Sequence, residues 1–141
     1  MSTILVVEFD RLTGSALGSR LEREGHEVLL CPGPGPQDYT CLGGRDETCP
    51  LERAADVIVL DLHLASDDMM LGTPGWQLLL HYVTAGKHVV AIVGDEDPVR
   101  PHSDDQVTVL RRPAAAETVA LAVQAALLAN TDFRSTSTVR A

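Results

Sequence analysis

The sequence predicts an α/β fold in which five parallel strands form one sheet with helices on both faces. Apolar runs of strand length alternate along the chain with segments of helical periodicity. The run Val57-Ile58-Val59-Leu60 contains no polar residue, which is typical of a strand buried on both faces. It ends at Asp61, and sheets of this kind bind ligands beyond the carboxyl ends of their strands.

The first strand is predicted over residues 3–7, and a helix follows over 11–24. Asp10 is a suitable N-cap for this helix, because its side chain can accept hydrogen bonds from the first free backbone N–H groups. Gly25 is a stop signal at the end of the helix. The chain then resumes as a second strand over 26–31.

The stretch 32–50 is rich in proline and glycine, so we expect a loop with a shortened second helix. A short helical turn over 51–55 leads into the third strand at 56–61. After a loop over 62–73, Pro74 is well placed in the first turn of a third helix, which Gly86 ends.

The fourth strand is predicted over 88–93. The segment 95–105 is acidic and contains two prolines, which makes it too interrupted for a regular fourth helix. A short fifth strand over 107–110 follows, and Pro113 opens a last helix. We therefore expect one domain over 1–129 and a flexible polar tail over 130–141.

The composition excludes several classes of protein. A chain of 141 residues with 45% apolar residues is long and apolar enough for one folded domain, not a disordered chain. The net charge of −9 argues against a nucleic-acid-binding face. No apolar run is long enough to cross a bilayer, and no secretory signal precedes the first strand, so a cytoplasmic protein that does not bind membranes is expected.

Acidic side chains follow two of the predicted strands. Glu8 and Asp10 come after the first strand, and Asp61 ends the third. Because parallel strands end at the same edge of the sheet, these acids suggest a common site. Carboxylates there can bind a metal ion, act as a nucleophile or cap a helix.

Three motifs together resemble the receiver domain of two-component response regulators, which has a flavodoxin-like (CheY-like) fold with strand order 2-1-3-4-5. They are Ile4-Leu5-Val6-Val7-Glu8-Phe9-Asp10, Val57-Ile58-Val59-Leu60-Asp61-Leu62 and Val109-Leu110-Arg111-Arg112-Pro113. The resemblance covers roughly residues 3–129. It implies that Asp61 matches the aspartate that a histidine kinase phosphorylates, beside a magnesium ion held by acids after the first strand.

The chain departs from the pattern that the resemblance implies. Phe9 stands where the second metal-binding acid is expected, so Glu8, Asp10 and Asp61 make a weak Mg²⁺ site at best. Gly94 stands where a hydroxyl side chain contacts the phosphoryl group, and Arg112 replaces a lysine. Arginine keeps the positive charge, but its planar guanidinium is not equivalent to an ammonium group.

Three cysteines fall in or beside the 32–50 loop: Cys31, Cys41 and Cys49. Their C-x9-C-x7-C spacing lacks the closely paired ligands of zinc sites, and an odd count argues against a disulfide framework. A redox-active pair or a metal site stays open, as does simple packing of these side chains.

The leading hypothesis is an atypical stand-alone response regulator that acts by protein–protein interaction, with weak or absent phosphorylation at Asp61. No output domain is expected after the last helix. The partner would be a histidine kinase, a phosphotransfer protein or another regulatory protein, and a homodimer is also open. A competent phosphoacceptor in a phosphorelay is one alternative, and a redox or metal sensor using the cysteine loop is another. Nothing in the sequence indicates an enzyme.

Overall fold

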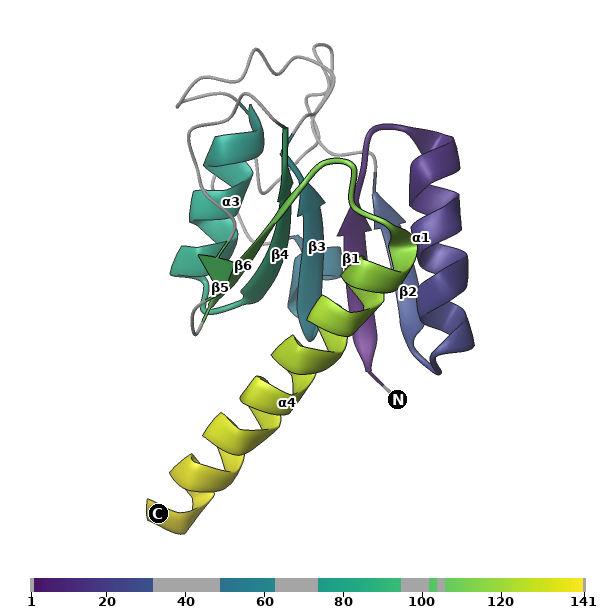
Figure 1. The fold of residues 1–141 in the computed structure, drawn as a ribbon. Helices are drawn as coiled ribbons and strands as arrows, with labels where there is room; N and C mark the ends of the chain where they lie inside the picture. Colours follow the sequence, from purple (N-terminus) through teal and green to yellow (C-terminus); the bar gives the residue numbers. More distant parts are fainter. Residues whose placement is uncertain (1, 32–48, 63–73, 95–101, 104–105, 141) are drawn as a thin grey trace.

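The computed structural model describes residues 2–31, 49–62, 74–94, 102–103 and 106–140. These residues form one sheet with helices on both faces (Figure 1). The strands are β1 (Thr3–Val7), β2 (Glu27–Cys31), β3 (Val57–Asp61), β4 (His88–Val93), β5 (His102–Ser103) and β6 (Val107–Arg111). The helices are α1 (Arg11–Arg23), α2 (Pro50–Ala54), α3 (Pro74–Thr84) and α4 (Ala116–Arg140).

The sheet confirms the predicted topology. The parallel strands stand in the order β2-β1-β3-β4-β6, which is 2-1-3-4-5 when the parallel strands alone are counted along the chain. β3 is therefore central, and all of its residues are buried, as its apolar run predicted. Its last residue, Asp61, therefore lies at the carboxyl end of the central strand.

One strand was not predicted. β5 pairs antiparallel with β6, with His102 opposite Val109, and it extends the edge of the sheet. It falls inside the acidic segment 95–105, where the sequence predicts a loop in place of the fourth helix. Residues 95–101 and 104–105 lie outside the described residues, and the described residues between β4 and β6 contain no helix.

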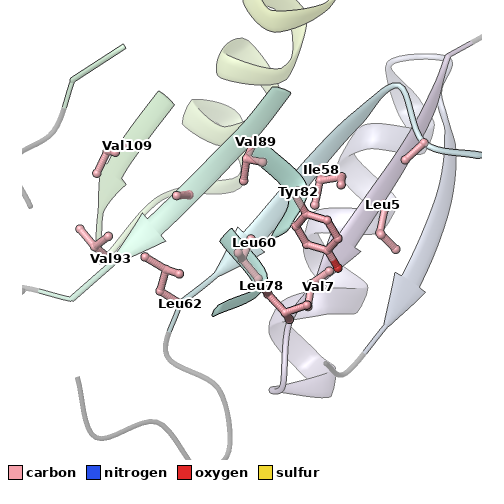
Figure 2. Close-up of a cluster of buried hydrophobic side chains, with 12 residues drawn as sticks. Leu5, Val7, Ile58, Leu60, Leu62, Leu78, Tyr82, Val89, Val93 and Val109 are labelled. Carbon is pink, nitrogen blue, oxygen red and sulfur yellow. The ribbon is translucent and has the colours of Figure 1, made fainter. Parts of the chain in front are cut away.

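Two apolar cores cover the two faces of the sheet, because successive side chains of a strand point to opposite faces. Leu5 and Ile58 belong to the core under α3, which contributes Leu78 (Figure 2). Ile4 and Val59 belong to the opposite core, under α1 and α4. The two cores fix the strands in register, so the residues that follow each strand are held at defined positions.

The ends of the first two helices follow the sequence signals. α1 begins after its N-cap Asp10, and Gly25 follows it with a φ of 95°, a conformation that favours glycine. α2 has only five residues, which confirms the prediction of a shortened second helix. Cys49 is its N-cap, and Pro50 occupies the first turn.

The last helix differs from its prediction at both ends. α4 begins at Ala116 instead of Pro113 and continues to Arg140, so the segment 130–140 is helical where a flexible tail was expected. The sequence after Pro113 contains neither glycine nor proline, and nothing in it stops a helix. None of the helices in the described part of the chain is long and apolar enough to cross a membrane.

Candidate functional site

The site lies at the carboxyl ends of β1, β3 and β6, where Glu8, Asp61 and Arg112 come together. Glu8 follows β1, Asp61 ends β3 and Arg112 follows β6. Asp61 and Glu8 are both buried, with exposed fractions of 6% and 8%. The guanidinium Nη2 of Arg112 donates a hydrogen bond to Oδ1 of Asp61 and forms an ion pair with it. Asp61 therefore has a cationic partner from its own chain.

The backbone holds these three residues in place. The N–H of Arg112 donates to the carbonyl of Val93 over 2.7 Å, which continues the β4–β6 pairing by one residue. The N–H of Glu8 donates to the carbonyl of Cys31 over 2.9 Å, which does the same between β1 and β2. The site thus rests on extensions of the sheet, and such supports position side chains rigidly.

Burial changes the protonation of Glu8. Desolvation, followed by the hydrogen bond and the negative charge of Asp61, raises the pKa of Glu8 to about 8. The backbone N–H of Asp10 and the charge of Arg112 oppose this shift in pKa but are smaller effects. Near neutral pH the Glu8 carboxyl therefore keeps its proton and can share a hydrogen bond with the Asp61 carboxylate.

The Asp10 carboxylate caps the amino end of α1. Its Oδ2 accepts a hydrogen bond from the N–H of Thr13 over 3.3 Å, and it also accepts one from the Thr13 hydroxyl. The hydroxyl bond is the main reason that the pKa of Asp10 is lowered. Asp10 lines the same pocket as Glu8 and Asp61, yet its carboxylate serves as the N-cap of α1.

The donor set does not fit Mg²⁺. This ion prefers several oxygen ligands in an octahedral arrangement, usually including carboxylates. Here Glu8 is protonated near neutral pH, Asp61 is paired with Arg112, and Phe9 stands at the position of the missing acid with 51% of its surface exposed. Within the described ranges, no group of three His, Cys, Asp or Glu side chains is arranged to hold a metal ion.

Gly94 and Arg112, the two candidates for phosphate contact, are placed differently. Gly94 is buried and has no side chain, and its carbonyl accepts a hydrogen bond from Nη1 of Arg111 over 3.3 Å. Arg112, in contrast, reaches Asp61. The two adjacent arginines therefore have different contacts: Arg111 donates to the carbonyl of Gly94, and Arg112 donates to Asp61.

Two pockets flank Glu8 and Phe9. The first has a volume of about 440 Å³ and is lined by Asp61, Arg112, Leu17 and Pro113, among others. The second has a volume of about 550 Å³ and lies toward β2, where Leu30 and Cys31 line it. Of these two pockets, the first is the one that Asp61 and Arg112 line.

Two of the three cysteines, Cys31 and Cys49, lie among the described residues. Cys31 ends β2 and packs against the core under α3. The Sγ atom of Cys49 accepts a hydrogen bond from the N–H of Glu52 over 3.3 Å, which caps α2. Cys41 lies outside the described residues, so the redox or metal hypothesis stays a prediction. The two described thiols each have a structural contact that accounts for them.

One polar pair was missed by the sequence analysis. Glu52 of α2 and His81 of α3 form a contact of 2.7 Å between Oε1 and Nε2, with side-chain exposures of 1% and 8%. The pair ties α2 to α3 at the margin of the core. The two residues are 29 positions apart, and no local motif marks either one.

Comparison with known proteins agrees with the fold described above. Solved receiver domains superpose over nearly the whole chain: one from Clostridium thermocellum, at 20% identity with a TM-score of 0.67, matches 94% of this chain and 99% of its own. The fold is that of a response regulator receiver domain. A receiver protein from Sinorhizobium medicae, at 18% identity with a TM-score of 0.61, matches 89% of this chain and 94% of its own.

Longer regulators contain the same receiver fold. NtrX from Brucella abortus, at 21% identity with a TM-score of 0.67, matches 99% of this chain, which spans 29% of that protein. At these identities the comparison establishes the receiver fold alone. No family model matches the sequence, and no curated protein matches it either.

Proposed function

We propose that this receiver-fold chain is an atypical response regulator that acts in two-component-type signalling through protein contact, with weak or absent phosphorylation at Asp61. The ion pair between Arg112 and Asp61 carries the proposal. Phosphorylation requires a carboxylate oxygen free to attack and nearby positive charge to balance the incoming phosphoryl group. Within the described residues, the cation that contacts Asp61 is the guanidinium of Arg112, and Asp61 already engages it.

The rest of the pocket supports the same conclusion. Glu8 is neutral near pH 7, because burial raises its pKa to about 8, and it adds no anionic ligand for a metal ion. Gly94 has no hydroxyl group for a phosphoryl oxygen. Attack by Asp61 would convert its singly charged carboxylate into an acyl phosphate with two negative charges. Within the described residues the guanidinium of Arg112 would have to balance both of them, which is unfavourable in a buried setting.

Exposed apolar side chains suited to a protein partner occur in β2, in the β1–α1 connection and in the first turn of α1. Phe9, Leu12 and Leu30 have exposed fractions of 51%, 83% and 52%, although all three are large apolar side chains. Phe9 and Leu30 line the same pocket beside the amino end of α1. Exposed apolar side chains beside a pocket are typical anchor points for proteins. The partner we propose is a histidine kinase, a phosphotransfer protein or another regulatory protein.

Phosphoryl labelling tests the proposal. Purified protein would be incubated with acetyl phosphate and Mg²⁺, and its intact mass would be measured. We expect no added phosphoryl group on the wild type. Asp61→Asn serves as the control for the site, because labelling of the wild type that disappears in this variant would refute the proposal. That result would favour the competent phosphoacceptor of a relay instead.

A further inference from the structure

The acidic pocket already contains a cation, namely the guanidinium of Arg112. Arg112 is held at two points. Its backbone N–H donates to the Val93 carbonyl, and Nη2 of its guanidinium donates to Asp61. The Arg112 side chain is 36% exposed, whereas that of Asp61 is 8% exposed. The cation therefore stands at the mouth of the pocket, between solvent and the buried carboxylate.

We propose that Arg112 is the resident counter-ion of Asp61 and excludes divalent metal ions from the acidic pocket. A divalent ion bound to Asp61 would stand within a few ångströms of the guanidinium, and in a partly buried pocket like charges repel strongly. The Arg112–Asp61 hydrogen bond would also have to break before the carboxylate oxygen could become a ligand. Phe9 adds no ligand, so it offers nothing to offset these costs.

This inference deepens the proposed function and rests on it for the role given to Asp61. A simpler explanation is that the replacement of an acid by Phe9 is the sole reason that the pocket lacks metal affinity. If the missing acid were the sole cause, Phe9→Asp would restore the site while Arg112 stayed in place. If Arg112 is the cause, its removal is required.

Four proteins separate these causes: the wild type, Phe9→Asp, Phe9→Asp with Arg112→Met, and Phe9→Asp with Arg111→Met. The last is the matched control, because it removes the same charge from the adjacent arginine, which contacts Gly94 instead of Asp61. Mn²⁺ is the probe, measured by electron paramagnetic resonance of the free ion, with Mg²⁺ as competitor. Circular dichroism and the melting temperature establish that each variant is folded.

We expect the wild type and Phe9→Asp to bind Mn²⁺ no more tightly than about 1 mM. Adding Arg112→Met to Phe9→Asp should tighten binding more than about tenfold, because the repulsive charge is gone. Adding Arg111→Met should change it by less than about threefold, since the guanidinium of Arg111 donates to the Gly94 carbonyl.

Several results would overturn the inference. They are sub-millimolar binding by the wild type or by Phe9→Asp, no gain on removing Arg112, or an equal gain on removing Arg111. If the Arg112 variant does not fold, the titration of Phe9→Asp decides alone: tight binding refutes the inference and no binding supports it. Labelling of wild-type Asp61 without Mn²⁺ binding would refute only the proposed function. Mn²⁺ binding without labelling would refute only this inference.

Discussion

The stability of this protein should fall as the pH rises through neutrality, and Glu8 is the reason. Burial and the neighbouring Asp61 raise the pKa of Glu8 from 4.5 to about 8 in the folded state. Between these two values the folded protein keeps a proton that the unfolded chain releases. The free energy of unfolding therefore decreases with rising pH in this window and has no slope from Glu8 outside it.

The size of the effect follows from the shift. One pH unit is worth about 1.4 kcal/mol per proton, so the full window corresponds to at most about 5 kcal/mol. Glu8 is 8% exposed, which leaves little solvent screening to reduce this figure. Most of the change in the free energy of unfolding should occur below about pH 8, because above this pH the Glu8 carboxyl of the folded protein is ionised as well.

Glu8→Gln is the variant that isolates this contribution, because glutamine resembles the protonated acid in shape and charge. Urea unfolding would be measured at several pH values between about 5 and about 8. The variant should gain stability relative to the wild type by up to about 1.4 kcal/mol per pH unit, since histidines and other groups titrate in both proteins and cancel. The exposed Glu22, changed to Gln, is the matched control and should follow the wild type. Parallel profiles for Glu8→Gln and the wild type would refute the reasoning.

Three further predictions concern other contacts. Arg112→Met should lower the free energy of unfolding by about 1–3 kcal/mol in urea denaturation, because Asp61 would keep a buried charge without its partner. Glu52→Ala should cost about 3–5 kcal/mol in the same assay, since it leaves His81 buried without its carboxylate; a change near zero would mean that the pair does not hold α2 to α3. Asp10→Ala should lower the melting temperature more than Asp10→Asn, because asparagine can still cap α1, and equal losses would contradict the capping role.

The strands and their order could be predicted because their signals are local. Each central strand is a short apolar run that ends at a polar or turn-forming residue. Because such a strand is buried on both faces, nearly all of its residues have to be apolar, and the run is easy to recognise. The alternation of strands and helices then restricts the topology to a few arrangements. The meeting of Glu8 and Asp61 follows directly, since parallel strands end at one edge.

What the sequence could not predict depends on contacts between distant side chains. Asp10 accepts hydrogen bonds from Thr13 as the N-cap of α1, and the residue type alone does not distinguish this contact from a metal ligand. The buried pair of Glu52 and His81 needs two helices to be placed first. The extension of α4 through 130–140 was not predicted, because small, polar residues at the end of the chain favoured a frayed tail, although no stop signal precedes them.

The charges of the pocket decide what a receiver fold can do with an aspartate at this position. A phosphorylation switch needs a site whose charge changes greatly when the phosphoryl group arrives, and metal ions and free donors make that change tolerable. Here Asp61 is balanced by Arg112, and near neutral pH Glu8 carries no charge to bring a metal ion closer. Asp10, whose pKa is lowered, also lines this pocket, so the pocket is negative overall at rest and a dianionic group would add to that charge. Under the proposed function, a partner would then bind the exposed apolar side chains Phe9 and Leu12 without any change at Asp61.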